Sequence, residues 1–401
     1  MYIRQGCVFS FEDAMKMQPA SKLEKIMVTL NLEPVISMMP LSRTGPTGYS
    51  FEAKLRALIA ARIEQIPSVA ALVRRLNADP VFRYTCGFEV MGSAPSEAAF
   101  SRFIKQITEL GIMEPLFQSM ISRAESMGII DGNVVSIDST KLEAYEKSKP
   151  RKYISADGQN ADWGAKCDTD GNKIKWFGNK VHQSVDTKSE LPLAIIVTSA
   201  SVHDSLPVIE LMAKTRANIK ADPKYWVMDS AYDSLSIYET VLNEYHAQAI
   251  IPLNIRNAKQ PEAGLDFDGT PICSCGYRMI YWGHHKGTNK FRCPHILGKV
   301  NCPFGSAWCS TSNYGMVAKT RVKENPRLFN APHRGTSNWQ QLYDKRTASE
   351  RCFSRQKEHL GLENLKVQGI MKVETHVYLC SIALYATVIA VNSPLEIERA
   401  A

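Results

Sequence analysis

The spacing of apolar and polar residues divides the chain into stretches with different periods. In the first part the period is helical: residues 51–64 place apolar side chains one turn apart, at Leu55, Leu58, Ile59 and Ile63. Ser68 and Ser96 each precede another such stretch and are suited to cap its first turn. We therefore expect an α-helical N-terminal domain over residues 1–125.

Two functions fit these short N-terminal helices. Helices joined by tight turns can read DNA, and Arg102 and Lys105 would be exposed on one of them. A bundle used for dimerisation or docking has the same pattern of apolar positions. The sequence leaves both functions open.

From about residue 130 the pattern changes to short β-branched runs. Residues 134–138 and 225–229 each read as an apolar strand with an Asp at its C-terminal end. Residues 180–186 and 191–198 predict a hairpin. With helices between the later strands, the order of elements predicts an α/β domain with a mixed sheet, whose first part covers residues 130–256.

The last third of the chain contains an irregular insertion and two helical stretches. Residues 257–335 are rich in Gly, Pro, Asn and Cys, with little helical period, and residues 336–401 return to the α/β domain. The apolar run at 377–391 is interrupted by Ser381 and Thr387 and is too short for a convincing membrane span. It predicts a buried helix, and no membrane partner is expected.

Charge and composition narrow the class of protein. The net charge of +8 and the pI near 8.9 favour a polyanionic partner such as nucleic acid. The N-terminus has no secretory signal, so the ten cysteines are expected to be reduced and the location cytoplasmic. The sequence contains no Gly-rich phosphate loop of the GxxxxGK(S/T) or GxGxxG kind, so it does not support ATP-driven or dinucleotide chemistry.

Four polar residues share one side of a predicted helix over residues 343–357. At 100° per residue, they fall within a sector of roughly 60°, and they are Tyr343, Arg346, Glu350 and Lys357. A helix that only packed on a core would place apolar residues there. A solvated charged face is the alternative on spacing alone.

Asp138 and Asp229 could form a three-carboxylate site together with Glu350 on this helix face. Carboxylates at the ends of neighbouring strands can converge with Glu350, and gathered carboxylates resist ionising together unless a cation holds them. Mg²⁺ is the natural ion, since it takes oxygen ligands and serves phosphoryl transfer. Alternatively, the two Asp residues only cap the elements that follow them.

The chain resembles the DDE transposases of bacterial insertion sequences, in the group with a Tyr-(2)-Arg-(3)-Glu-(6)-Lys signature. The residues at 343, 346, 350 and 357 match all four positions and all three gaps. Ile137-Asp138-Ser-Thr140 and Met228-Asp229-Ser-Ala-Tyr-Asp233 are similar to the first and second Asp motifs of that family. The resemblance covers nearly the whole chain.

The resemblance implies an RNase H-like catalytic domain in which Asp138, Asp229 and Glu350 bind Mg²⁺ or Mn²⁺. It also implies hydrolysis at the transposon ends, followed by attack of the freed 3′-hydroxyls on target DNA. Tyr343, Arg346 and Lys357 would hold terminal phosphates. The implied partners are double-stranded DNA, as terminal inverted repeats and target, and a second copy of the chain. The location would then be cytoplasmic and associated with the nucleoid.

The insertion holds half of the chain's cysteines, with a histidine among them. This predicts a small structural Zn²⁺ site in a zinc-ribbon-like fold, with Cys273, Cys293, Cys302 and Cys309 as the four ligands. Cys275 and His295 are the substitutes, and buried free thiols are the alternative. A hairpin over 279–292 would interleave basic and aromatic residues suited to DNA contact, namely Arg278, Lys286, Lys290 and Arg292 with Tyr281, Trp282 and Phe291.

Two other functions stay open beside a transposase. The same three acids would serve a stand-alone metal-dependent nuclease. A catalytically silent DNA-binding protein derived from a transposase would use only the helical and Cys-rich parts, although the complete set of acids and signature residues argues against it.

Overall fold

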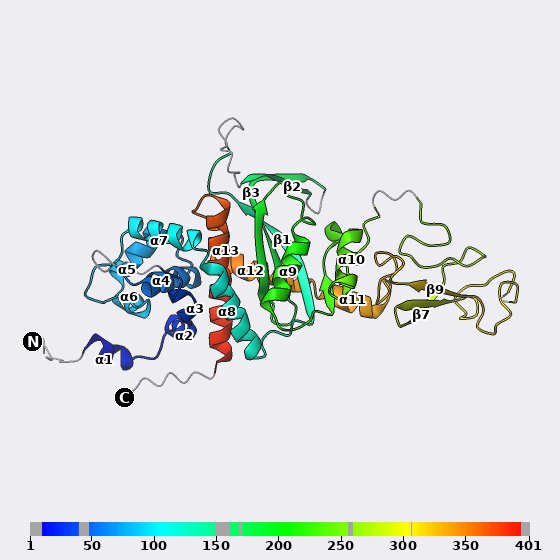
Figure 1. Cartoon of the computed structure of the whole chain (residues 1–401), viewed down its shortest axis with the longest axis horizontal. Coiled ribbons are helices and arrows are strands. Elements are labelled where there is room, and N and C mark those ends of the chain that lie inside the picture. Colours follow the sequence, from blue (N-terminus) through cyan, green and yellow to red (C-terminus); the bar gives the residue numbers. More distant parts are fainter. Residues whose placement is uncertain are drawn as a thin grey trace, which may run out of the picture.

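The computed structural model describes residues 10–39, 48–148, 161–167, 171–255, 260–305 and 307–393. The molecule is elongated, with helices at one end, a twisted sheet in the middle and the Cys-rich insertion at the other end (Figure 1).

In the described residues before the sheet there are eight helices. Ser68 caps α5 and Ser96 caps α7 through their side chains, as the sequence predicts. Pro80 stands in the first turn of α6, where its missing N–H costs nothing, and Asp79 caps that helix. The helices are α1 (Phe11–Lys16), α2 (Lys22–Thr29), α3 (Glu33–Ile36), α4 (Phe51–Ile63), α5 (Val69–Ala78), α6 (Pro80–Thr85), α7 (Glu97–Glu109) and α8 (Met113–Ser126).

A six-stranded mixed sheet forms the centre of the molecule. Its strands are β1 (Val134–Glu143), β2 (Asp162–Cys167), β3 (Lys173–Asp186), β4 (Pro192–Ser199), β5 (Tyr225–Val227) and β6 (Gln248–Ile250). The main path runs β2-β3-β1-β5-β6, and β4 pairs with β3. β1, β5 and β6 are parallel, whereas β3 is antiparallel to β1, β2 and β4. Helices α9 (Val208–Asn218) and α10 (Leu235–Asn243) connect the later strands.

The insertion and the C-terminal helices complete the fold. An antiparallel three-stranded sheet consists of β7 (Ile280–His285), β8 (Thr288–Arg292) and β9 (Val317–Arg321), and β7 and β8 form the predicted hairpin. It is followed by α11 (Ser337–Asp344), α12 (Thr347–Leu360) and α13 (Ile370–Asn392).

α13 is the central helix of the core. In the described part of the chain it is the one helix long and apolar enough to cross a membrane, but 78% of its most apolar stretch is buried inside the protein. It packs against α8, α4, α2 and α7 on one side and against β4 and α12 on the other. The predicted buried helix is therefore confirmed.

Two predictions about individual elements were wrong. The helix expected over residues 343–357 is two helices, since α11 ends at Asp344 and α12 begins at Thr347. The packing explains the break: Trp339 and Leu342 belong to a small core with β5 and β6, while α12 packs on β1, β3 and α13. The first strand also runs past Asp138 to Glu143, because the long strand β3 pairs with it up to that point.

Candidate active site

The three predicted acids line one cavity of about 510 Å³ at the edge of the central sheet. Asp138 reaches it from β1, Asp229 from the turn after β5, and Glu350 from the first turn of α12. Arg346 and Lys357 line the same cavity. Segments more than two hundred residues apart in sequence therefore meet at one place.

Asp138 lies in the middle of β1 rather than at its C-terminal end. On one side it pairs with Gln183 of β3, but on the other side β5 ends at Val227, opposite Ser136. The sheet is thus open next to Asp138 on the side of β5. Asp229 follows the last paired residue of β5 by two positions, as Asp138 follows Ser136 in β1, and both side chains line the cavity.

Asp229 also has the local role that the sequence left open. Its Oδ1 accepts a hydrogen bond of 2.8 Å from the backbone N–H of Ala231 and caps a single 3₁₀ turn at Ser230–Tyr232. The second carboxylate oxygen is free of this bond. One carboxylate can therefore cap a turn and face the cavity.

Arg346 bridges the other two acids. Its Nη2 donates to Oε1 of Glu350, and its Nη1 lies 3.6 Å from Oδ2 of Asp138. Glu350 itself is exposed, in the first turn of α12, where the positive end of the helix favours a carboxylate. The guanidinium thus supplies a positive charge between two carboxylates.

The electrostatics show that the acids act on one another. Burial and the charge of Asp229 raise the pKa of Asp138 to about 6, against the opposing effects of the Ser139 N–H, Arg346 and Lys166. For Arg346, burial lowers the pKa, but the hydrogen bond and charge of Glu350 and the charge of Asp138 outweigh it and raise the pKa overall. Such mutual shifts in a cavity are typical of functional sites.

The two remaining signature residues differ in position. Lys357 lines the cavity, and its Nζ lies 2.9 Å from Oε1 of Glu363. Tyr343 is in the last turn of α11, where it stacks on Trp339 with ring centroids 5.1 Å apart. The guanidinium of Arg346 lies 6.0 Å from the Tyr343 ring. Tyr343 therefore borders the site through Arg346 and does not line the cavity itself.

Two further residues belong to the site that sequence reasoning did not assign to it. Lys166 of β2 lines the cavity beside the acids. The Tyr232 hydroxyl is buried, and its pKa is raised by burial and by the charges of Asp138, Asp204 and Asp229. Lys166 lies far from the motifs in sequence, so only the pairing of β2 with β3 reveals its place.

Comparison with known families identifies the chain. Residues 130–386 match the family model described as "Transposase DDE domain", and residues 12–106 match a "Transposase domain (DUF772)". The chain belongs to the DDE transposase family. It is a DNA transposase, a metal-dependent enzyme of DNA cleavage and strand transfer, and the resemblance noted in the sequence is confirmed.

Two other comparisons complete the picture of its relatives. No curated protein matches the transposase chain. A solved structure that resembles it is the "Cryo-EM structure of piggyBac transposase synaptic complex with hairpin DNA (SNHP)", with a TM-score of 0.44 and 11% sequence identity. That similarity covers 94% of this chain and 76% of the other.

The family implies a divalent metal cofactor for the transposase. Three carboxylates on one cavity suit Mg²⁺ or Mn²⁺ by their chemistry, and the Arg346 bridge marks a place that favours positive charge. In the described residues, however, no three Asp, Glu, His or Cys side chains are gathered closely enough to hold an ion. The donor set fits, but Glu350 is turned toward Arg346.

The predicted zinc ligands are likewise not assembled as a set. Among the residues described, no three Cys or His side chains of the insertion are gathered closely enough to hold a metal ion, Cys275 and His295 included. Sγ of Cys302 lies 3.5 Å from Sγ of Cys275. Burial, the hydrogen bond from Cys302, and the charges of Cys302, Cys273 and Cys309 raise the pKa of Cys275 to about 11.

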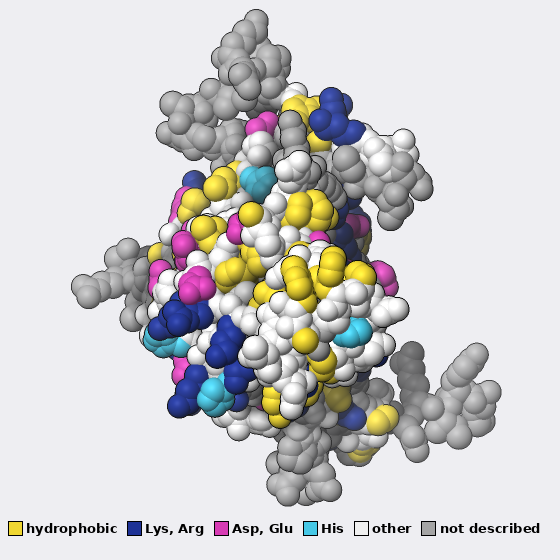
Figure 2. Space-filling view, turned by 90° about the vertical axis from the view of Figure 1, so that its right-hand side faces the viewer, with side chains coloured by type: hydrophobic (Ala, Val, Ile, Leu, Met, Phe, Trp, Pro, Cys, Tyr) yellow, Lys and Arg dark blue, Asp and Glu magenta, His cyan; other side chains and the backbone are white. Residues whose placement is uncertain are grey.

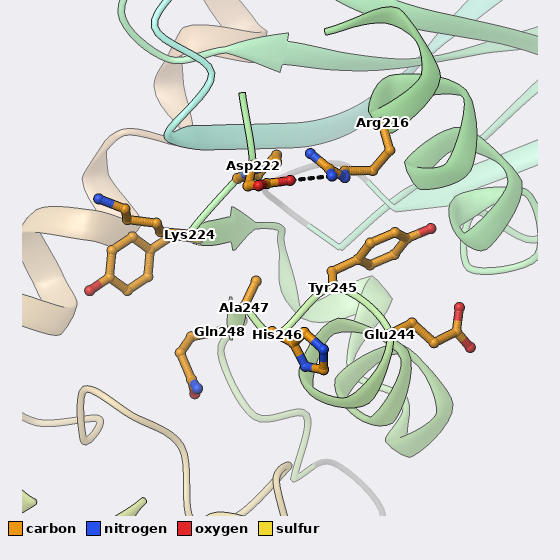
Figure 3. Close-up of a pocket in the computed structure, with 10 residues that line it drawn as sticks. Arg216, Asp222, Lys224, Glu244, Tyr245, His246, Ala247 and Gln248 are labelled. Atoms are coloured by element: carbon orange, nitrogen blue, oxygen red, sulfur yellow. Dashed lines mark ion pairs between the residues drawn. The ribbon is translucent and has the colours of Figure 1, made fainter. Parts of the chain in front are cut away.

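The transposase has a second cavity of about 510 Å³, at the opposite edge of the sheet (Figure 3). It lies where β5 and β6 begin, with Arg216 and Asp222 forming an ion pair at its rim. None of the predicted acids lines it. The three predicted acids therefore lie at the edge of the sheet where the parallel strands end, and not at this one.

Proposed function

We propose that Asp138, Asp229 and Glu350 are the catalytic acids of an RNase H-like domain. The observation that carries the proposal is their convergence on one cavity from β1, β5 and α12. The topology of the sheet supports an RNase H-like fold. An antiparallel unit of β4, β3 and β1 continues into the parallel strands β5 and β6, with helices between them. Ligand sites in such sheets lie where the parallel strands end.

The metal would be held by the carboxylates of these three acids. When bound, Mg²⁺ or Mn²⁺ activates the attacking oxygen and stabilises the leaving one in phosphoryl transfer. Asp138 must be ionised to serve as a ligand, which its neighbours Arg346 and Lys166 favour. To serve as a ligand, Glu350 would have to give up its hydrogen bond from Arg346, which would leave the guanidinium for a DNA phosphate.

Arg346 and Lys357 are proposed to bind phosphates next to the cleaved bond. Both line the cavity, and Arg offers a planar fork while Lys offers a point charge. Tyr343 stacks on Trp339 and approaches the Arg346 guanidinium, so its ring would position Arg346 while its hydroxyl contacts DNA at the margin of the site.

The reaction proposed is hydrolysis at both transposon ends, which exposes 3′-hydroxyls, and attack of those hydroxyls on target DNA. Both steps are phosphodiester transfers, so one set of residues can serve them in turn. The substrates are then the terminal inverted repeats and a target duplex. Because two ends are joined together, a homodimer on DNA is expected, at the nucleoid in the cytoplasm.

The test supplies the purified transposase, Mg²⁺ and a duplex bearing the element's terminal repeat. Cleavage followed by joining to a second duplex is the expected result. Cleavage without joining would indicate a stand-alone nuclease, and binding without cleavage a silent DNA-binding protein. A size measurement of the complex on paired ends tests the homodimer separately.

We also propose a structural Zn²⁺ site in the insertion, with Cys275 in place of Cys293. Two thiolates on one tetrahedral zinc lie about 3.8 Å apart, given Zn–S bonds of about 2.3 Å. The distance of 3.5 Å between Cys275 and Cys302 is close to this, and Cys273 and Cys309 are the other thiols that act on Cys275. The Cys293 side chain instead lies against Gly315.

Metal analysis of the folded protein tests this site. One zinc per chain is expected in the wild type and in Cys293→Ser, whereas Cys275→Ser should lose it. Absence of zinc from a folded wild-type preparation would refute the site. If only Cys293→Ser lost its zinc, the ligands would be those expected from the sequence, with Cys293 in place of Cys275.

A further inference from the structure

The insertion carries most of the net charge of the molecule. Residues 260–335 contain ten Lys and Arg residues against four Asp and Glu residues, a net charge of +6 out of +8 for the whole chain. Part of this charge is neutralised, because Arg278, Arg321 and Arg327 pair with carboxylates. Arg334 is buried and donates to backbone oxygens, so it is not available either.

The two faces of the β7–β9 sheet differ. The inner face carries Phe291 and Asn289, which are buried: Phe291 packs against His333, and Asn289 donates to the backbone oxygen of Asn330. The outer face carries the alternate residues of the strands. There Lys290 stands opposite Lys319.

That opposed pair of lysines has no internal counter-charge. In the part of the chain that the structure describes, neither Lys290 nor Lys319 forms an ion pair with a carboxylate. Like charges directly opposite each other on two strands destabilise a sheet. A bound anion would remove this cost.

Arg292 extends the outer face by one more cation, held in an unusual way. Its guanidinium lies 4.1 Å from the ring centroid of Trp282 and 4.8 Å from that of Tyr314. The Arg292 side chain is only 9% exposed, and its buried Nε has no hydrogen-bond partner among the described residues. The two aromatic rings are themselves 57% and 62% exposed. Arg292 is thus fixed in orientation without a counter-ion.

On the outer face Lys319, Trp282 and Tyr314 are exposed, whereas Lys290 is half-buried. Figure 2 views the molecule from the end of the insertion and shows exposed hydrophobic side chains across the face, with Lys and Arg side chains grouped beside them. Arg278, Tyr281 and Phe291, which the sequence placed among the DNA contacts, are excluded from it by their ion pairs or packing. Lys319 and Tyr314, which the sequence did not single out, belong to it.

This surface is attached firmly to the catalytic edge. Asn330 donates a hydrogen bond of 2.6 Å to the backbone oxygen of Ala249 in β6, and Arg334 donates to that of Ile251. Arg327 pairs with Asp233, four residues after Asp229. The insertion is therefore anchored where the parallel strands end, on the side of the acids.

We propose that the outer face formed by Lys290, Arg292 and Lys319, with Trp282 and Tyr314, binds the phosphate backbone of duplex DNA beyond the cleavage site. The proposal deepens the proposed function and rests on DNA being the substrate. Arg292 supplies a pre-oriented fork for one phosphate, and the two lysines supply point charges along the strand. No base is read, so binding through this face is independent of sequence.

The test measures binding of the full-length protein to a mixed-sequence duplex of about 40 base pairs by fluorescence anisotropy, in EDTA and at several salt concentrations. For Lys290→Gln with Lys319→Gln, the dependence of log affinity on log salt should become shallower by about 2, with affinity about tenfold weaker or more. Adding Arg292→Gln should remove about one more unit of slope. Arg292→Lys should keep part of the affinity, because the charge remains.

The matched control removes the same charge elsewhere. Lys188→Gln with Lys220→Gln changes two exposed lysines at the opposite edge of the sheet and should leave the slope unchanged. Equal slopes for the test and control pairs would overturn the proposal. The proposal would also be overturned if the Lys290 and Lys319 double variant lost binding to single-stranded DNA but not to the duplex, or if it lost only self-association. Failure here with normal wild-type cleavage would leave the proposed function intact.

Discussion

Asp138, proposed as a catalytic acid, also affects the stability of the folded protein. Its pKa is raised from 3.8 to about 6, so the folded protein holds a proton on it more tightly than the unfolded chain does. Stability in the absence of metal should therefore fall as pH rises from about 4 through about 6. The cost arises from burying a carboxylate beside Asp229.

Replacing Asp138 with Asn should remove this cost. We expect Asp138→Asn to be more stable than the wild type by about 1 to 3 kcal/mol at pH 7, and the difference to vanish below about pH 4. Thermal unfolding of both proteins across this pH range, without divalent metal, measures it. A variant that is less stable than the wild type at pH 7 would show that the carboxylate is satisfied in the folded state.

Arg346 occupies the space between Asp138 and Glu350, so it should compete with a bound cation. In DNA-free protein, Arg346→Ala should bind Mn²⁺ about three- to tenfold more tightly, because one positive charge beside the acids is removed. Titration calorimetry gives the affinity. Cleavage should fall in the same variant, since a phosphate contact is lost. Unchanged or weaker Mn²⁺ binding would contradict the bridge.

At the level of elements, α12 carries Glu350, and a buried polar network joins this helix to β3 and α13. Gln356 accepts from Gln183 of β3 at 3.0 Å and donates to Ser381 of α13 at 3.1 Å. Ser381, which interrupts the apolar run in the sequence, is therefore a partner of α12. This network sets how the helix presents Glu350 to the cavity.

Gln356→Ala should lower the free energy of unfolding by about 2 to 3 kcal/mol, because it leaves buried polar groups on Gln183 and Ser381 without partners. Denaturant unfolding measures this loss. His359→Ala, at an exposed position of the same helix, is the control and should change stability by less than about 0.5 kcal/mol. A similar small effect for both variants would mean that the network does not fix the helix.

The sequence predicted the helices and strands better than the positions at which they end. Local signals such as Ser68, Ser96 and the β-branched run at 134–138 depend on neighbouring residues, and the helices and strands formed as expected. The break between α11 and α12 depends on where Trp339 packs, and the length of β1 depends on its partner β3. Neither long-range contact has a signal in the local pattern.

The sequence motifs predicted which acids meet at the site, whereas the positions of its basic residues depend on tertiary contacts. Asp138, Asp229 and Glu350 meet at one cavity as their strand and helix positions suggested. The bridge formed by Arg346 and the entry of Lys166 come from side-chain directions and strand pairing, which spacing in the sequence does not encode.

At the level of the whole molecule, one hydrophobic core runs from the N-terminal helices through the central sheet to α13. A smaller, separate cluster around Phe291 supports the insertion. Because this core is continuous, the N-terminal helices and the central sheet should unfold as one unit.

We therefore expect the helices α4 and α8, the strand β3 and α13 to lose amide protection together on unfolding, while β7–β9 open separately. Hydrogen exchange measured by mass spectrometry at increasing denaturant tests this. Early loss of protection in α4 and α8, well before β3, would instead indicate two independent folding units.

We propose that three carboxylates, brought together from β1, β5 and α12, perform the chemistry. The most direct measurement is the single-turnover rate of Mg²⁺-dependent cleavage at a transposon end for Asp138→Asn, Asp229→Asn and Glu350→Gln. The control is Glu358→Gln, which removes another carboxylate from the wall of the same cavity. Each of the three variants should lose cleavage by about 10³-fold or more while still binding DNA, and the control should keep the wild-type rate. Full cleavage by any one of the three would refute the proposed catalytic role of these acids.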